Sequence, residues 1–276
     1  MQAIDPAELE AQTGGDADLA REVLELFAGQ CRSILPRLAD PALPRDARAD
    51  LAHTLKGSAA GVGAVHVRAL ADAAETRLGA GLSVIALPGD VSRAGEAEAM
   101  VSAGIDRLGG LDVLVNNAGT SGTTTPIAFE DLDAMGEDFW QTILATNLLG
   151  PFRCARAAAA TLKASRGAIV NTASVAGLGR RGSSVAYSAS KAGLINLTRS
   201  LARALAPDVR VNAVAPGLVA TPWTEPWSEE RKASTVGRTM LGRMARPEDI
   251  AETIFFLGAG AAYITGETIT VDGGAI

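Results

Sequence analysis

The sequence predicts an α/β protein in which an N-terminal helical segment precedes a Rossmann-like parallel sheet with helices on both faces. Residues 5–80 are rich in Ala, Leu, Arg and acidic residues, with apolar side chains at helical spacing. From residue 81 onward, short apolar runs alternate with longer helical stretches, a pattern typical of strand–helix–strand units. We therefore place a domain boundary in the stretch RLGAGLS (77–83), with a helical segment at 1–80 and a sheet domain at 81–276.

The individual elements follow from the apolar pattern. In the helical segment, the apolar residues at helical spacing are Leu19, Val23, Leu26, Phe27 and Ile34. In the sheet domain, five short apolar runs predict strands: SVIAL (83–87), LDVLV (111–115), GAIVNTA (167–173), VRVNAVA (209–215) and ETITV (267–271). Because helical stretches separate these runs, the strands are expected to pair in parallel.

Composition and charge argue against several classes of function. The 276 residues are 47% apolar and 20% charged, with a net charge of −6, so nucleic acid is not an expected partner. Two cysteines (Cys31 and Cys154) and two histidines are too few for a disulfide framework or a metal cluster. No stretch approaches the ~20 apolar residues that span a bilayer, and MQAIDPAELE lacks a basic segment followed by an apolar run. We expect a cytoplasmic protein with no membrane partner and no metal.

The stretch AHTLKGSAAGVGA (52–64) has two incompatible interpretations. Gly57, Gly61 and Gly63 have the spacing of a phosphate-binding loop between a strand and a helix. That interpretation would place His53 in a central parallel strand, which should be apolar on both faces. It also requires a second strand that ends in an acidic residue ~20 positions later, and the sequence offers none.

The alternative interpretation of the same stretch is a helix. On a helical wheel the leucines lie on one side, whereas His53, Lys56 and Gly57 lie on the other. The pattern therefore predicts a helix over 44–62 with His53 exposed.

These residues, together with the preceding GGDADLAREVLELF, resemble a histidine-containing phosphotransfer domain, whose motif is His-x-Leu-Lys-Gly-Ser. The resemblance covers residues 4–78 and implies that His53 accepts a phosphoryl group from the aspartate of a receiver domain. Neutral imidazole is a nucleophile, Lys56 one turn away can balance phosphoryl charge, and Gly57 leaves room for a partner. Such domains are four-helix bundles, and the sheet pattern starts before a final helix, so we expect a partial bundle.

Tyr187 and Lys191 carry the chemistry predicted for the sheet domain. Their spacing in YSASKAGLINLTRSLARAL places phenol and ammonium on one face of a helix. An adjacent cation favours the phenolate and draws the pKa of a tyrosine from ~10 towards neutrality, where it can exchange protons with an alcohol or carbonyl. Ser174 follows an apolar strand, at the edge where open α/β sheets bind ligands. We predict Tyr187 as the acid/base, with Ser174 bonded to the same substrate oxygen.

Further motifs accompany this pair in a fixed order. They are LVNNAG (114–119), NLLG (147–150), VNAVAPGLVATP (211–222) and VDGG (271–274). With the Ser-x12-Tyr-x3-Lys spacing, residues 82–276 resemble a short-chain dehydrogenase/reductase. The resemblance implies NAD or NADP as cofactor, a small-molecule alcohol or carbonyl substrate, and a homo-oligomer.

The resemblance also implies a role for each matching residue. Asn147 would hold a proton-relay water, Ser174 would orient substrate, Tyr187 would be the acid/base, and Lys191 would tune it while holding the nicotinamide ribose. The other implied cofactor contacts are Asp90 and Val91 at the adenine, Asn117 and Gly119 on the adenosine side, and Pro216, Gly217 and Thr221 at the nicotinamide. From the residues alone, Asn117 can equally tie neighbouring strands together, and Gly217 can be a turn glycine.

The N-terminal part departs from that family pattern. Family members begin with a strand, a Thr-Gly-x3-Gly-x-Gly loop, a helix and a second strand, whereas here the phosphotransfer-like helices occupy those positions. We therefore expect an incomplete sheet and an impaired pyrophosphate site. Three interpretations stay open: an NAD(P)-dependent oxidoreductase fused to a helical segment, a phosphorelay protein with a catalytically silent sheet domain, and a join of two truncated genes.

Overall fold

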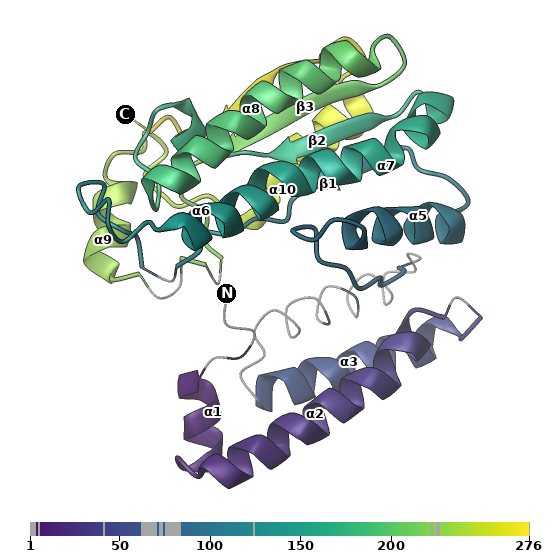
Figure 1. Cartoon of the computed structure of the whole chain (residues 1–276), viewed down its shortest axis with the longest axis vertical. Helices are drawn as coiled ribbons and strands as arrows, with labels where there is room; N and C mark the ends of the chain where they lie inside the picture. The colour runs from purple at the N-terminus through teal and green to yellow at the C-terminus, as the bar shows by residue number, and fades with distance from the viewer. Residues whose placement is uncertain are drawn as a thin grey trace. The chain divides into compact units, whose positions relative to one another are not determined.

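The computed structural model describes residues 4, 6–40, 42–61, 71, 74, 84–123, 125–221, 223–224 and 227–275 (Figure 1). The chain divides into two compact units, Met1–Pro88 and Gly89–Ile276. The predicted boundary at 80/81 lies outside the described residues.

The described part of unit 1 is helical, with α1 (Pro6–Thr13), α2 (Ala17–Leu38) and α3 (Arg45–Gly61). Asp16 caps the N-terminus of α2, because its carboxylate accepts hydrogen bonds from the backbone N–H groups of Asp18 and Leu19 at 2.9 and 3.0 Å. Ile34 and Leu38 of α2 pack against Ala52 and Leu55 of α3. Leu19 and Leu26, in the N-terminal half of α2, are exposed. The buried apolar residues of this helix therefore lie mostly in its C-terminal half.

The predicted helix over 44–62 is confirmed at residues 45–61, which form α3. Residue 44 is not helical, and residue 62 lies outside the described residues. His53 is exposed, as predicted. Gly57 and Gly61 lie inside α3, which excludes a strand and phosphate loop over the described residues, and Gly63 lies outside them.

Unit 2 contains a parallel sheet in the order β1-β2-β3-β4. Its strands are β1 (Val113–Asn116), β2 (Ala168–Thr172), β3 (Arg210–Pro216) and β4 (Thr268–Val271). Ala168 faces Val113 on one side and Arg210 on the other, which fixes the register. These strands confirm four of the five predicted ones.

The predicted strand at 83–87 is wrong over residues 84–87, which have no regular structure, and residue 83 lies outside the description. An extended segment becomes a strand only when a neighbouring strand satisfies its backbone groups. Here the carbonyl of Val84 instead accepts a hydrogen bond from the buried guanidinium of Arg48, which also donates to the carbonyl of Leu38.

Helices cover both faces of the sheet (Figure 1). One face carries α5 (Glu96–Leu108), α7 (Gly150–Ser165) and α8 (Val185–Leu205), packed on Ile169 and Val211. The other carries α10 (Pro247–Phe255) and the π-helical η3 (Phe256–Gly260), packed on Val170 and Val214. The remaining elements are α6 (Glu137–Leu144), the π-helical η1 (Ala145–Leu149), the 3-10 turn η2 (Val175–Leu178) and α9 (Glu229–Val236).

Buried asparagines tie the strands of unit 2 to each other and to α8. Asn116 of β1 donates to Asn171 of β2 at 2.8 Å, and Asn171 donates to Thr198 of α8 at 2.9 Å. Because a buried polar group without a partner is costly, this chain fixes how β1, β2 and α8 align. It thereby positions the C-terminal ends of the strands, where the predicted site residues lie. Among the described helices, none is both long and apolar enough to cross a membrane.

Candidate active site

The start of α8 positions Tyr187 and Lys191. The hydroxyl of Ser184, the N-cap residue, accepts the backbone N–H of Tyr187 at 3.0 Å, so the helix begins directly before the tyrosine. The Lys191 ammonium lies 5.8 Å from the centroid of the Tyr187 ring. A Cβ added to Gly182 would lie 3.1 Å from Cδ1 of Tyr187, so the segment before α8 forms one wall against the ring.

Lys191 is a buried cation with one strong acceptor. Its side chain is only 3% exposed, and its ammonium donates to the backbone carbonyl of Thr172 at 2.8 Å. Burial lowers the pKa of Lys191 to about 8, because desolvation penalises the charged form. The ammonium is thus held at the C-terminal end of β2.

The side chains of Ser174 and Tyr187 are hydrogen-bonded to each other. Ser174 ends the segment that follows β2, caps η2 by accepting the N–H of Ala176 at 3.2 Å, and hydrogen-bonds the tyrosine side chain. Burial nevertheless raises the pKa of Tyr187, and the hydrogen bond to Ser174 only partly opposes it. The expectation that Lys191 draws the pKa of Tyr187 towards neutrality is wrong. Desolvation of the phenolate by burial is the largest effect, and it raises the pKa of Tyr187.

Asn147 lies in η1, a π-helical stretch between α6 and α7, and is fully buried. Its Oδ1 accepts the N–H of Thr120 at 2.8 Å, and its Nδ2 donates to Thr120 O at 2.9 Å and to Ser190 Oγ at 3.1 Å. The side chain therefore joins the loop after β1 to α8. Single π turns inside helices are frequent at functional sites.

Gly119 lies between the buried asparagine and the buried lysine. A Cβ built there would be 3.4 Å from Lys191 Nζ and 3.5 Å from Asn147 Oδ1. The Asn117 Oδ1 accepts the hydroxyl of Thr172 at 3.0 Å, which is the strand-tying contact that the residues alone allowed. The structure thus brings Gly119, Asn147 and Lys191 together, with Asn117 exposed beside them.

Asp90 and Val91 start a loop that is anchored next to η1. The Asp90 carboxylate accepts the N–H and hydroxyl of Ser92 at 2.8 and 2.6 Å, and these bonds lower its pKa. The carbonyl of Val91 accepts a hydrogen bond from Arg153 at 3.1 Å, and the same guanidinium donates to Ala145 of η1. The loop is therefore fixed to the helix that carries Asn147.

Pro216 is the last residue of the third strand, and Gly217 and Thr221 follow it. Pro216 ends β3 opposite Val271, and Gly217 donates its N–H to Val271 O at 3.0 Å. A Cβ on Gly217 would meet Asp272 Cβ at 2.9 Å, so close approach to β4 explains this glycine. The N–H of Thr221 donates to the hydroxyl of Thr224 at 3.2 Å.

Sequence reasoning missed four residues that complete this arrangement. Thr120 and Ser190 hold Asn147, Thr172 holds Lys191, and the Trp223 ring meets the Tyr187 ring edge-on with centroids 6.1 Å apart. Thr172 acts through its backbone carbonyl, which any residue could supply. Ser190 acts through its hydroxyl, which any small hydroxyl residue could supply. No sequence motif therefore marks either residue. Trp223 lies in 218–240, which the pattern left unassigned.

The described residues fit one half of a dinucleotide. Gly119 leaves a position without a side chain next to the buried Lys191 ammonium, which could donate to a ribose, and next to the amide oxygen of Asn147. A glycine-rich loop that leads from a strand into a helix does not occur among the described residues of unit 2. The pyrophosphate half is therefore not accounted for by the part of the chain described.

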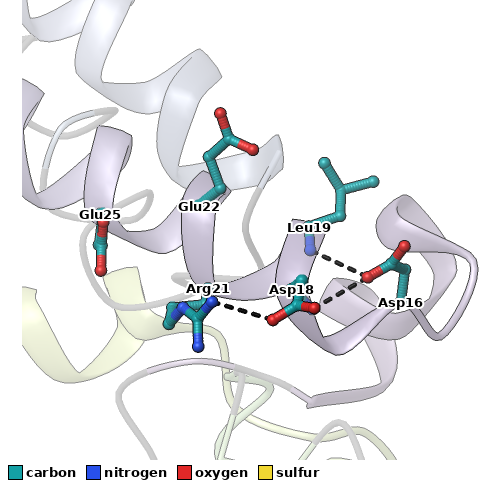
Figure 2. Close-up of a pocket in the computed structure, with 6 residues that line it drawn as sticks. All are labelled: Asp16, Asp18, Leu19, Arg21, Glu22 and Glu25. Atoms are coloured by element: carbon teal, nitrogen blue, oxygen red, sulfur yellow. Dashed lines mark hydrogen bonds and ion pairs between the residues drawn. The ribbon is translucent and has the colours of Figure 1, made fainter.

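Unit 1 offers a different surface. A shallow hollow on α2 is lined by Asp16, Asp18, Leu19, Arg21, Glu22 and Glu25 (Figure 2). The Arg21 guanidinium pairs with Asp18 at 2.9 Å, and both side chains are exposed, so this is a solvated acidic face. Within the described ranges, no three His, Cys, Asp or Glu residues gather to hold a metal ion.

Comparison with known protein sequences gives consistent matches. The family described as enoyl-(acyl carrier protein) reductase matches residues 49–275. The 3-oxoacyl-[acyl-carrier-protein] reductase FabG of Staphylococcus aureus (strain Mu50) is 40% identical over 197 residues, which cover 70% of this chain and 78% of that protein. A 3-oxoacyl-[acyl-carrier-protein] reductase of Synechocystis is 39% identical over 200 residues, or 71% and 77% of the two chains.

Solved structures agree. A 3-oxoacyl-[acyl-carrier protein] reductase with bound NAD from Brucella melitensis is 34% identical, with a TM-score of 0.63, over 74% of this chain and 76% of that chain. A glucose/ribitol dehydrogenase of the same short-chain class, from the same organism, gives a TM-score of 0.64 at 34% identity, over 74% and 82%. The sequence match to the family begins inside α3, at a position that is helical in this chain.

Proposed function

This chain belongs to the short-chain dehydrogenase/reductase family of NAD(P)-dependent oxidoreductases, and on that premise we propose that Tyr187, Lys191, Ser174 and Asn147 form its catalytic centre. The observation that carries the proposal is the convergence of the four residues from η1, the start of η2 and α8 on the C-terminal end of the sheet. Open α/β sheets bind their ligands at this edge.

Tyr187 supplies the proton in the proposed reduction. The nicotinamide, when bound, provides or accepts the hydride. Burial keeps the Tyr187 hydroxyl protonated, so it can donate to the oxygen of a carbonyl as that oxygen gains negative charge. Ser174, which already bonds the tyrosine, can bond the same oxygen and orient it.

Lys191 and Asn147 support that transfer. The Lys191 ammonium, fixed by Thr172, places positive charge near the tyrosine and stabilises the phenolate that remains after proton donation. Asn147 uses its side chain to fix the loop at Thr120 and α8 at Ser190, which holds the two halves of the site in register. On the resemblance to the family, we also propose that Asn147 holds a proton-relay water.

The cofactor contacts remain proposals of the same kind. As the family resemblance implies, Asn117 and Gly119 would line the adenosine side, and the loop at Asp90 and Val91 would line the adenine. Pro216, Gly217 and Thr221 would lie at the nicotinamide. Because unit 2 shows no glycine-rich phosphate loop among its described residues, we propose weak binding of the pyrophosphate.

For the substrate we propose a carbonyl compound with a 3-oxoacyl group, because several relatives are named as 3-oxoacyl-[acyl-carrier-protein] reductases. The test is consumption of NADPH or NADH by the purified full chain with a 3-oxoacyl thioester, against a simple ketone at equal concentration. Turnover of the thioester supports the assignment. Turnover of the ketone alone would retain the reductase and reject the 3-oxoacyl class.

We further propose self-association, because the end of η1 and the start of α7 expose apolar side chains. Leu149 is 44% exposed, and Phe152 is 38% exposed beneath the Arg156 guanidinium. Exposed apolar surface of this kind is typical of interfaces. Light scattering of the full chain would give twice the monomer mass or more, and a clean monomer would reject the proposal.

A second candidate function concerns unit 1. His53 is exposed on α3, and a Cβ on Gly57, one turn later, would meet nothing within 4 Å. The helix therefore presents an imidazole beside an unobstructed surface that a partner domain could approach. We propose His53 as a phosphoryl acceptor from a receiver domain; the support is the motif and this exposure, not the comparisons.

A further inference from the structure

The loop from Ser174 to Gly182 packs against α8 at three positions. The Ser174 side chain is hydrogen-bonded to that of Tyr187, and a Cβ added to Gly182 would lie 3.1 Å from Cδ1 of the same tyrosine. Between these two points, a Cβ on Gly177 would lie 2.6 Å from the backbone carbonyl carbon of Lys191. The loop therefore begins and ends at the tyrosine, and its position determines how the tyrosine is surrounded.

Arg180 connects this loop to the end of β4. It follows Gly179, which ends η2 in the left-handed conformation, and its backbone N–H donates to Val175 O at 3.2 Å. Its side-chain Nη1 lies 3.1 Å from Oδ2 of Asp272, the residue directly after β4. The Arg180 side chain is 42% exposed, whereas that of Asp272 is only 8% exposed. An ion pair between a half-exposed cation and a nearly buried carboxylate thus joins the loop to β4.

The ion pair crosses the C-terminal end of β3. In the sheet, β3 lies between β2, which the loop follows, and β4, which Asp272 follows. A Cβ on Gly217, the residue after β3, would lie 2.9 Å from Asp272 Cβ, so the aspartate packs directly against this position. The Asp272 Oδ1 accepts the N–H of Gly274 at 2.9 Å, which fixes the carboxylate. Because parallel strands end at one edge of the sheet, the pair lies at the edge where ligands of open α/β sheets bind.

Arg180 and Asp272 attract each other by charge rather than through a directional hydrogen bond. Nη1 and Oδ2 are 3.1 Å apart, but their angles do not form a hydrogen bond, and Oδ2 has no hydrogen-bond partner among the described residues. A nearly buried carboxylate without a compensating charge is costly, so Arg180 is favoured to stay beside it. Because charge alone is needed, a lysine at position 180 can take the same role.

We propose that Arg180 and Asp272 are positioning residues, whose ion pair holds the Ser174–Gly182 loop across the end of β3 and so fixes Ser174 and Tyr187 for proton transfer. The loop contacts the tyrosine at both of its ends, so a loop that is released on the β4 side no longer holds the two hydroxyl groups in one arrangement. A misplacement of about 1 Å can cost ~10²-fold in rate. The catalytic consequence rests on the proposed reductase function, whereas the restraint on the loop does not.

Limited trypsin digestion of the full chain measures how firmly the loop is held. Trypsin cleaves after arginine in segments that open, and the loop contains Arg180 and Arg181 in succession. The D272N variant removes the charge but keeps an oxygen for the Gly274 N–H. We expect cleavage after either arginine, identified by mass spectrometry, to be about fivefold faster in D272N. The E229Q variant, which breaks an exposed ion pair with Lys232 on α9, is the matched control and should be cleaved there at the wild-type rate.

Turnover of the 3-oxoacyl thioester measures whether the ion pair positions the site. R180Q and D272N should each lower kcat by about tenfold with little change in KM, because the pair acts through the loop. R180K should keep the wild-type kcat, since it keeps the charge. The double variant R180Q/D272N should be no slower than either single variant, because the pair is broken only once. R199Q loses an exposed arginine of α8 and should behave as the wild type. Far-UV circular dichroism checks that each variant is folded.

Equal cleavage of the wild type and D272N would overturn the proposal, as would a kcat that falls as far in R180K as in R180Q. Faster cleavage with unchanged kcat would also overturn it, because the loop would then be held without positioning the site. The two measurements separate the ion pair from the reductase itself. Faster cleavage of D272N in a chain without turnover would leave the restraint on the loop standing and reject the enzymatic function, whereas turnover that depends on Tyr187, with equal cleavage, would do the reverse.

Discussion

The Lys191 ammonium donates a 2.8 Å hydrogen bond to the carbonyl oxygen of Thr172 and is otherwise buried. A charge in this position costs stability, and its lowered pKa of about 8 expresses that cost. Because Lys191 is buried, its titration makes the free energy of unfolding depend on pH. This dependence can be measured without cofactor and without enzyme turnover.

We expect Lys191 to make unit 2 more stable as the pH rises from 7 to 9.5. The folded-state pKa of about 8 lies below the unfolded value of 10.5. Between these values the unfolded chain holds a proton that the folded chain has lost, so the free energy of unfolding rises with pH. Over this range the lysine should contribute an increase of about 2 kcal/mol.

Urea denaturation of the wild type and K191M at pH 7 and 9.5 measures this contribution. All three tryptophans, Trp140, Trp223 and Trp227, lie in unit 2, so their emission follows that unit. The difference between the two proteins at each pH cancels the contributions of the other titrating groups to the free energy of unfolding. One of these groups is Cys154, because burial raises its pKa. An equal pH dependence in both proteins would show that Lys191 is not the buried cation described.

Tyr187→Phe should remove the proton donor while keeping the ring that packs on Gly182 and Trp223. We expect kcat to fall by ~10²–10⁴, with unchanged urea stability. His53→Gln serves as the control and should leave turnover alone, since His53 lies in unit 1. Turnover that survives in the phenylalanine variant would remove Tyr187 from the catalytic centre.

Much of the arrangement of the proposed catalytic centre could be predicted because its residues occur at fixed short spacings. Tyr187 and Lys191 are one helical turn apart, so their shared face follows from the helix itself. Ser174 and Gly217 follow apolar runs, so the edge of the sheet at which they lie follows from the strands. The alternation of strands and helices gave the fold class for the same reason.

What could not be predicted depends on long-range contacts. Residues 84–87 have the composition of a strand, but the described residues provide no neighbouring strand, and Arg48 binds the Val84 carbonyl instead. The pKa of Tyr187 depends on how deeply the fold buries it, which its distance in sequence from Lys191 does not reveal. The Asn147 partners, Thr120 and Ser190, lie 27 and 43 positions away, so no local pattern marks them.

The network around Asn147 should contribute to the stability of unit 2. Asn147→Ala would leave the N–H and carbonyl of buried Thr120 without their partner. An unsatisfied buried group costs ~1–3 kcal/mol, so the free energy of unfolding should fall by at least that amount. Asn196→Ala, at an exposed position of α8, is the matched control and should change little. Equal effects of the two substitutions would contradict the network.

The second candidate function predicts phosphorylation at one histidine. A phosphorylated receiver domain should transfer its label to the full chain, and His53→Gln should abolish the transfer because it removes the nucleophilic nitrogen. Lys56→Ala should slow the transfer without abolishing it. The other histidine, His66, provides the control: label that persists in the His53 variant or depends on His66 rejects the assignment.

The last prediction concerns cofactor affinity. In a dinucleotide-binding fold, backbone N–H groups at a helix N-terminus hold the pyrophosphate, and the helix dipole adds to their attraction for the anion. The described part of unit 2 has no strand–glycine loop–helix segment to supply them. Hydrogen bonds to a charged group contribute ~1.5–3 kcal/mol each, so the loss of two would weaken binding by ~10²–10⁴-fold.

We therefore expect NADH and NADPH to bind the full chain with dissociation constants weaker than about 10 μM, near −7 kcal/mol. Quenching of Trp140, Trp223 and Trp227 during titration measures the affinity, and the comparison of the two nucleotides gives the preference between NAD and NADP. Lys191→Met should weaken both nucleotides further, because the ribose loses its buried cation, while Arg199→Gln should not. Binding tighter than 10 μM would mean that residues outside the described part, Gly63 and its neighbours first among them, rebuild the phosphate site, and substitution of Gly63 would then weaken both nucleotides equally.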